Sequence, residues 1–275
     1  MDPFVPASWL EQHDGVRVVD VRDRWEYDSI GHLPGAVNVP FESFRSDEGE
    51  AGKLPPRGEW EDLLSAAGID ADDEIVAYDD TQGVFAARFA VTALLLGHDP
   101  AKVHVLDGDF SSWQREGETT TDAIDERRSS ANRTQSDDVD PKPAHYVSDP
   151  DAETPLVDFE TVNELLPAVE AGDVTLVDTR EDWEFEEGHL PGAVQVDWRE
   201  LVDEESRGLK PEAELRALLE ARGIVPGKRA VLYCNTARRV SHTYLALREL
   251  GYEDVGLYEG SLTEWEDRGG EIVSE

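Results

Sequence analysis

The feature that most constrains this chain is an internal repeat. An Asp-x-Arg motif followed by Gly-His-Leu-Pro-Gly-Ala begins at Asp20 and Gly31, and the same pair of motifs returns at Asp178 and Gly188. The spacing of about 157 residues is far longer than the period of roughly 20–50 residues found in solenoid repeats. The chain therefore contains two copies of a whole domain, and its 275 residues suffice for two domains of ordinary size.

Short β-rich runs alternate with helical stretches in each copy. We expect strands at Val16–Val21, Ala36–Val39, Ile75–Tyr78 and Val103–Leu106, and again at Val174–Asp178, Ala193–Val196, Ala230–Tyr233 and Val255–Tyr258. We expect helices at Gly58–Ala67, Val84–Leu96, Glu212–Ala221 and Val240–Leu250. Strands that alternate with helices predict an α/β fold, in which each copy is a parallel sheet with helices on both faces.

A polar segment separates the two copies. Residues 118–155 are rich in Thr, Asp, Ser, Pro and Glu, and Tyr146 is their only aromatic residue. Such a composition buries little apolar surface and indicates an acidic, polar connector. We therefore predict an N-terminal domain over residues 1–117 and a C-terminal domain over residues 156–275.

The charge balance limits the choice of partners. The chain has 62 Asp and Glu residues against 25 Lys and Arg, a formal net charge of −37, which repels nucleic acid and anionic membranes. A surface so acidic and so poor in Lys favours an origin in a salt-accumulating halophilic archaeon, where salt screens the self-repulsion. No signal peptide and no long apolar run are present, so we expect a cytoplasmic protein without nucleic-acid or membrane partners.

The only cysteine of the chain, Cys234, follows the strand that ends at Tyr233 and precedes a helix. A single cysteine rules out an internal disulfide and a Cys-rich metal cluster. Backbone N–H groups and the helix N-terminus would stabilise a thiolate at this junction, and Arg238 and Arg239 add two cations. The matching position of the first copy is Asp79. Only the second copy can therefore supply a sulfur nucleophile.

The repeated motifs and the loop that begins with Cys234 resemble the rhodanese family, in particular its tandem-domain thiosulfate sulfurtransferases. The resemblance spans essentially the whole chain and implies two tandem rhodanese-like domains, of which the first is catalytically silent. It implies Cys234 as the nucleophile, with no metal and no organic cofactor. Vertebrate members carry an Arg where this chain has Glu184, so anion binding is expected to depend on the loop cations. The expected substrate-binding residues are Arg239 first and Arg238 second, with the backbone of Asn235, Thr236 and Ala237.

The predicted activity is transfer of the outer sulfur of thiosulfate to a thiophilic acceptor, cyanide or a thiol, through a persulfide on Cys234. One alternative is a 3-mercaptopyruvate sulfurtransferase. Another is a Cys-loop phosphatase or arsenate reductase, although such enzymes have Arg at the position of Val240. The last is a non-enzymatic scaffold that carries sulfur for a partner protein.

Other polar residues receive structural roles. The pairs Asp20–Arg22 and Asp178–Arg180 occur in both copies and are expected to form structural ion pairs. His32 and His189 are duplicated in the same way and are expected to hold a turn. His242 is expected on the surface of its helix.

Overall fold

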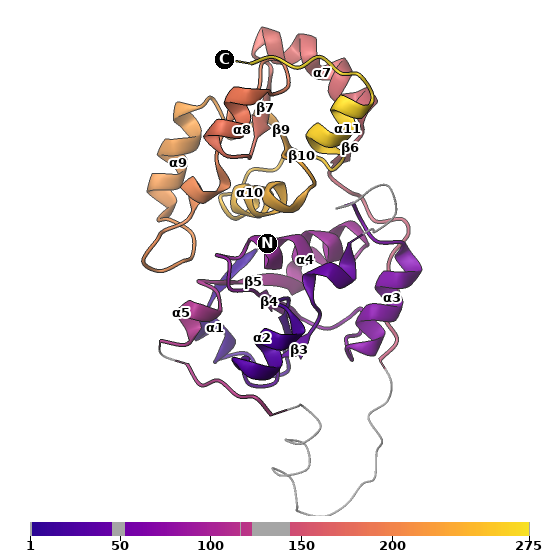
Figure 1. Cartoon of the computed structure of the whole chain (residues 1–275), viewed down its shortest axis with the longest axis vertical. Coiled ribbons are helices and arrows are strands. Elements are labelled where there is room, and N and C mark those ends of the chain that lie inside the picture. Colours follow the sequence, from indigo (N-terminus) through magenta and orange to yellow (C-terminus); the bar gives the residue numbers. More distant parts are fainter. Residues whose placement is uncertain (1, 46–52, 116, 123–143, 275) are drawn as a thin grey trace, which may run out of the picture. The chain divides into compact units, whose positions relative to one another are not determined.

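The fold consists of two compact units of the same design. The structure, a computed structural model, describes residues 2–45, 53–115, 117–122 and 144–274. The N-terminal unit comprises Val5–Arg45 and Leu54–Ala152, and the C-terminal unit is built mainly from Glu153–Glu275. Each unit contains one five-stranded sheet with helices on both faces (Figure 1). The α/β fold class predicted from the repeat is therefore confirmed.

The N-terminal sheet has the strand order β1-β5-β4-β2-β3, and its pairs β5–β4, β4–β2 and β2–β3 are parallel. The strands are β1 (Phe4–Pro6), β2 (Arg17–Asp20), β3 (Val37–Asn38), β4 (Ile75–Tyr78) and β5 (Val103–Asp107). The helices are α1 (Ala7–Leu10), α2 (Arg24–Ser29), α3 (Arg57–Ala66), α4 (Val84–Leu95) and α5 (Phe110–Trp113), with 3-10 turns η1 (Phe41–Phe44) and η2 (Pro100–Lys102).

The C-terminal sheet repeats this topology in the order β6-β10-β9-β7-β8, again with parallel pairing. The strands are β6 (Leu156–Val157), β7 (Val174–Asp178), β8 (Val194–Gln195), β9 (Arg229–Tyr233) and β10 (Val255–Tyr258). The helices are α7 (Phe159–Ala171), α8 (Asp182–Glu187), α9 (Glu212–Ala221), α10 (Arg238–Glu249) and α11 (Ser261–Asp267), with the 3-10 turn η3 (Trp198–Leu201).

The central strand β9 is buried on both faces. Val231 and Tyr233 belong to a core cluster with Leu176 and Trp265, and α10 also packs against β9 and β10. Strands covered on both sides read as continuous apolar runs rather than alternating ones. The carboxyl end of β9 is consequently the place where the chain leaves the core, and ligands of open α/β sheets collect at such ends.

The connector predicted over residues 118–155 lies partly outside the described residues, because 123–143 are not among them. Of its described part, Tyr146 is 1% exposed and its backbone N–H donates to Ser65 Oγ at 2.9 Å. Residues 144–152 thus belong to the N-terminal unit. The domain boundaries themselves stay a prediction.

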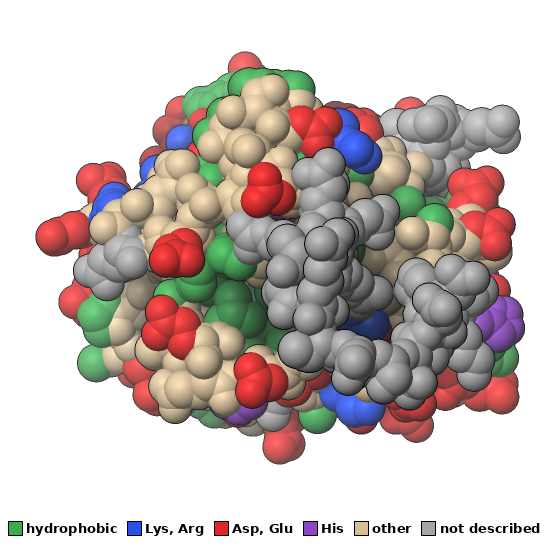
Figure 2. Space-filling view, turned by 90° about the horizontal axis from the view of Figure 1, so that it is seen from below, with side chains coloured by type: hydrophobic (Ala, Val, Ile, Leu, Met, Phe, Trp, Pro, Cys, Tyr) green, Lys and Arg blue, Asp and Glu red, His purple; other side chains and the backbone are tan. Residues whose placement is uncertain are grey.

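The surface is strongly acidic. Asp and Glu side chains are spread over the face shown in Figure 2, and Lys and Arg side chains are far fewer there. Among the residues that the structure describes, no helix is both long enough and apolar enough to cross a membrane.

Candidate active site

Cys234 lies at the carboxyl end of β9, four residues before α10 begins. Its backbone N–H donates to Ser261 Oγ at 3.1 Å, and its carbonyl accepts a hydrogen bond from the N–H of Leu262 at 3.0 Å. Ser261 adopts a left-handed backbone with φ of 53°, a conformation that costs free energy and concentrates at functional sites. The start of α11 therefore fixes the backbone of Cys234. Sequence analysis did not identify Ser261 as part of the site.

The thiol is enclosed by protein. The Cys234 residue is only 1% exposed. The Cys234 side chain is therefore shielded from bulk solvent.

The loop after Cys234 is short and strained. Asn235 and Thr236 are half-buried, and Ala237 caps α10 with φ of 65° in the left-handed region. Glycine adopts this conformation without strain, but alanine does not. The carbonyl of Ala237 accepts a hydrogen bond from Ser241 Oγ at 2.7 Å, which helps to hold the turn. In the other copy Gln82, which like Ala237 lies four residues beyond the strand end, has φ of 56°.

Both loop cations lie in the first turn of α10, which begins at Arg238. Arg239 donates through both terminal nitrogens to the carboxylate of Glu184, at 2.9 Å for the Nη2–Oε1 pair. Burial lowers the pKa of Arg239, but the hydrogen bond to Glu184 and the electrostatic interactions with Cys234 and Glu184 outweigh it and raise the pKa above its ordinary value. Both terminal nitrogens of Arg239 are directed to the carboxylate of Glu184.

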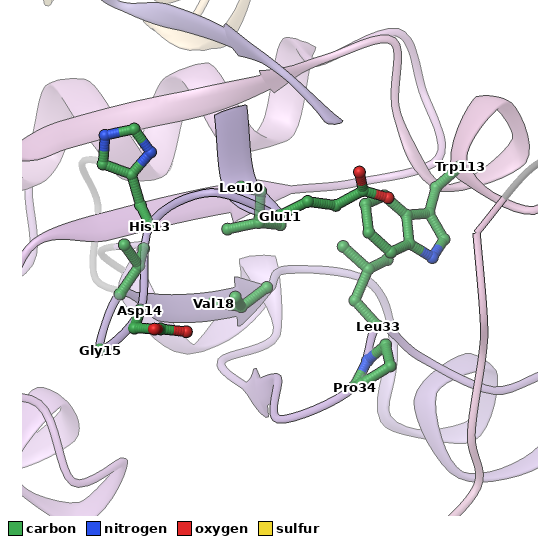
Figure 3. A pocket seen from close by; sticks show the side chains of 10 residues that line it. Leu10, Glu11, His13, Asp14, Gly15, Val18, Leu33, Pro34 and Trp113 are labelled. Carbon is green, nitrogen blue, oxygen red and sulfur yellow. The ribbon is translucent and has the colours of Figure 1, made fainter. Parts of the chain in front are cut away.

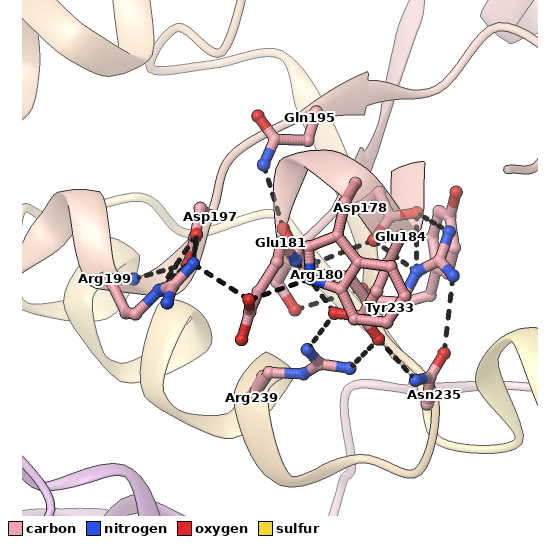
Figure 4. A network of polar contacts seen from close by, with 12 residues as sticks. Asp178, Arg180, Glu181, Glu184, Gln195, Asp197, Arg199, Tyr233, Asn235 and Arg239 are labelled. Carbon is pink, nitrogen blue, oxygen red and sulfur yellow. Dashed lines mark hydrogen bonds and ion pairs between the residues drawn. The ribbon is translucent and has the colours of Figure 1, made fainter. Parts of the chain in front are cut away.

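A network of polar side chains extends from this pair (Figure 4). Asn235 Nδ2 donates to Glu184 Oε1 at 2.8 Å, and Arg180 Nη1 donates to Asn235 Oδ1 at 3.5 Å. Arg180 itself binds Asp178 through Nε and Nη2, the latter at 2.7 Å. The Asp-x-Arg element thereby contacts the loop that follows Cys234. The predicted ion pair is confirmed, and so is its counterpart between Asp20 and Arg22.

The duplicated histidines hold turns, as expected. His32 stacks on Tyr27 and His189 stacks on Phe185, each with ring centroids 3.7 Å apart. Nδ1 of His189 lies 2.8 Å from the carbonyl oxygen of Phe185. These rings tie the Gly-His-Leu-Pro-Gly-Ala turn to the preceding helix in both units.

The prediction for His242 is wrong. This residue is 1% exposed, and its ring meets Trp198 of η3 edge-to-face at 5.5 Å. A helix that packs on the sheet with one side and on η3 with another buries residues that simple amphipathic spacing leaves outside.

Asp79 occupies the position of Cys234 in the N-terminal unit and is 1% exposed. Its carboxylate accepts four backbone hydrogen bonds, from the N–H groups of Thr81 (2.8 Å), Gly83 (2.8 Å), Phe85 (2.7 Å) and Ala86 (3.1 Å). Burial raises the pKa of Asp79, and the four hydrogen bonds act against that rise. Successive N–H groups that converge in this way form an anion-binding concavity, which here is filled by the protein's own carboxylate.

The Asp79→Asn variant should lose stability in the N-terminal unit without losing activity at Cys234. The amide nitrogen of Asn cannot accept hydrogen bonds, so buried N–H groups are left unpaired at a cost of about 2 kcal/mol. Urea unfolding measures the change as a lower midpoint. Asp28→Asn, at an exposed site, serves as the control. An unchanged midpoint for Asp79→Asn would contradict the role assigned to the carboxylate.

A hollow of about 240 Å³ lies elsewhere in the N-terminal unit. Figure 3 shows Leu33 and Trp113 on its apolar side and His13 and Asp14 at the opposite end. Neither Asp79 nor Cys234 lines it. The hollow is thus separate from both strand-to-helix loops.

Comparison with known proteins also identifies two copies of one domain in the chain. A model of the rhodanese-like domain matches residues 7–116 and 161–268. A putative thiosulfate sulfurtransferase of Haloferax volcanii is 31% identical, over 96% of this chain and 93% of its own. A thiosulfate sulfurtransferase of Azotobacter vinelandii is 31% identical, over 90% of this chain and 87% of its own.

A solved structure supports the same relationship. SseA from Escherichia coli, described as a 3-mercaptopyruvate sulfotransferase with the rhodanese fold, superposes with a TM-score of 0.76 at 25% identity. The match covers 95% of this chain and 99% of that one. The similarity therefore includes both units.

Proposed function

The chain belongs to the rhodanese family, with one rhodanese-like domain in each half, and on this premise we propose that it is a thiosulfate sulfurtransferase that works through a persulfide on Cys234. The names of its relatives support this activity. Cys234 supports it chemically, because it is the one residue of the chain that can carry a sulfur atom as a persulfide.

The proposed reaction has two halves. The Cys234 thiolate attacks the outer sulfur of thiosulfate, the S–S bond of thiosulfate breaks, and sulfite leaves with the electron pair. Cyanide or a thiolate then attacks the outer sulfur of the persulfide, and the Cys234 thiolate leaves and is restored. Both halves of the reaction require an anionic sulfur on Cys234 to be stabilised, so the same hydrogen-bond donors can serve the whole cycle.

The observation that carries the proposal is the Asp79 carboxylate, held by four backbone N–H groups. Cys234 stands at the corresponding strand-to-helix junction in the other unit. A loop of this kind stabilises a buried carboxylate in the N-terminal unit. The corresponding loop is therefore suited to stabilise a thiolate or persulfide anion on Cys234. We assign the cradle to the backbone N–H groups from Asn235 through Thr236 and Ala237 to Arg239, with Arg239 and Arg238 as the cations.

A second candidate donor is 3-mercaptopyruvate, which the structural likeness to SseA favours. Its thiol sulfur would pass to Cys234 with release of pyruvate, so the persulfide and the acceptor half stay the same. Comparing kcat/KM for the two donors decides between them.

The direct test is the persulfide itself. Treating the protein with thiosulfate, without an acceptor, should add about 32 Da, the mass of one sulfur atom. Cyanide should then remove the added mass and yield thiocyanate in equal amount. A parallel assay with a phosphate ester tests the phosphatase alternative. Absence of both the adduct and thiocyanate, in dilute buffer and in molar salt, would refute the proposal.

The cellular setting that we propose is the cytosol of a salt-accumulating organism. The cytosol keeps thiols reduced, as a catalytic thiolate requires. The charge of −37 and a relative from Haloferax volcanii support the saline setting. The proposed partners are a small sulfur donor and a thiophilic acceptor.

A further inference from the structure

Glu184 has two sets of contacts, and only one of them serves the helix. As the third residue of α8, its carboxylate accepts the N–H of Glu181 at 3.1 Å and caps the helix. Glu26 does the same for Asp23 at the start of α2, also at 3.1 Å. The cap therefore explains why both copies have a glutamate here. It does not explain what Glu184 does in addition.

The additional contacts go to the catalytic loop. Both carboxylate oxygens of Glu184 bind Arg239, and Oε1 also accepts from Asn235 (Figure 4). The side chains of Glu184 and Arg239 are only 10% and 12% exposed, so solvent screens this pair weakly. Glu26, within the described residues, bonds to no loop side chain. Glu184 thus acts on the loop only in the copy that has the cysteine.

Glu184 is ionised at neutral pH. Burial raises its pKa, but hydrogen bonds from Arg239, Glu181 and Asn235 and the charge of Arg239 bring the pKa below its ordinary value. The pair is therefore a carboxylate opposite a guanidinium, with no net charge. The neighbouring ion pair of Asp178 with Arg180 also has no net charge.

We propose that Glu184 determines which donor charge the loop accepts: by neutralising Arg239, it disfavours doubly charged sulfur donors relative to singly charged ones. The inference rests on the proposed function and refines it. A second negative charge on the donor gains little from a guanidinium that is already paired and is repelled by the nearby carboxylate. Glu184 is then a specificity-determining residue, not a catalytic one.

Two donors with the same reactive sulfur isolate the effect of charge. Thiosulfate carries two negative charges, and methanethiosulfonate carries one. In both, Cys234 attacks the outer sulfur and the S–S bond breaks; the electron pair leaves with sulfite in one case and with methanesulfinate in the other. The persulfide formed is identical. In a ping-pong cycle, kcat/KM for the donor reports only this first half.

The expected result concerns the ratio of kcat/KM for thiosulfate to that for methanethiosulfonate. Glu184→Gln should raise this ratio about tenfold at low ionic strength, because it removes one charge beside the donor. The gain should shrink in 1 M salt, where the Debye length is about 3 Å. Glu184→Asp keeps the charge and should leave the ratio near that of the wild type. Glu26→Gln, the matched change in the other copy, should leave both constants unaltered.

A ratio that stays the same in Glu184→Gln, or that falls, would overturn the proposal and leave Glu184 as a support for the loop. An equal shift in Glu184→Asp and Glu184→Gln would overturn it too, since geometry and not charge would be the cause. The dissociation constants of both donors for Cys234→Ser, with and without Glu184→Gln, test charge selectivity independently of turnover. A wild type that forms no persulfide from either donor would refute sulfur transfer, while these binding constants would still decide the role of Glu184.

Discussion

Sulfur transfer should fall by at least about a thousandfold in the Cys234→Ser variant, because nucleophile replacements of this kind remove the covalent route altogether. A serine hydroxyl is close in size to the thiol, so the buried site keeps its packing, but it cannot form a persulfide. The backbone bonds to Ser261 and Leu262 do not involve the side chain. Intact mass after thiosulfate treatment should show no added sulfur.

The control for this variant is Asp79→Asn, which changes the matching position of the other copy and should retain transfer per folded molecule. Thermal melts of both variants distinguish loss of chemistry from loss of fold. Thiocyanate production by Cys234→Ser at more than a few per cent of the wild-type rate would refute the assignment of the nucleophile. A second acceptor-dependent site would then have to be sought elsewhere in the chain.

Acid should destabilise the C-terminal unit through His242. Burial lowers the pKa of His242 to about 4, from an ordinary value of 6.5. As the pH falls below 6.5, His242 becomes protonated in the unfolded chain. In the folded chain the same imidazole stays neutral until about pH 4. Stability present above pH 6.5 is therefore lost between these two values, by about 3 kcal/mol in total. Urea unfolding at a series of pH values measures the loss.

The matched variant is His242→Phe, which keeps an aromatic ring against Trp198 and cannot titrate. Nδ1 of His242 has no hydrogen-bond partner among the described residues, so phenylalanine breaks no bond at that atom. The variant should lose less stability than the wild type between pH 6.5 and pH 4, while His145→Gln, in the other unit, should follow the wild type. Identical pH profiles for His242→Phe and the wild type would contradict the prediction.

The sequence predicted the central strands well and the edges poorly. The expected strands Ile75–Tyr78, Val174–Asp178 and Val255–Tyr258 agree with the structure residue for residue. Strands buried on both faces are continuous apolar runs, which are easy to recognise. The edge strand β6 has two residues and β1 has three, too few for any periodicity to show.

One helix that the sequence did not predict is polar, and one predicted helix begins at another residue than expected. Helix α8, Asp182–Glu187, contains four acidic residues among six and has little apolar pattern. Helix α10 was expected to begin at Val240 but begins at Arg238. Two cations in a first turn oppose the helix dipole, so propensity alone argues against that start. Positions where the sequence departs from the usual helix preferences, as here at the start of α10, are often functional.

The site was predicted in part. The position of Cys234 followed from the repeat, because the two copies differ at that residue. Glu184 entered the sequence argument only as the place where a related Arg is missing, and its bond to Arg239 needed the fold. Its occurrence three residues into both helices was the available signal. The contacts of Cys234 with Ser261 and Leu262 could not be predicted, because these residues are remote from it in sequence.

The four backbone donors around Asp79 have a consequence for the ageing of the protein. A carboxylate in such a loop is permanent, whereas a sulfur in the same kind of loop can be oxidised step by step, and a cysteine sulfinate is irreversible under most conditions. A sulfinate is shaped and charged much like the aspartate carboxylate. Oxidation of Cys234 to the sulfinate would therefore place an anion that resembles Asp79 at the carboxyl end of β9, and the proposed persulfide could no longer form there.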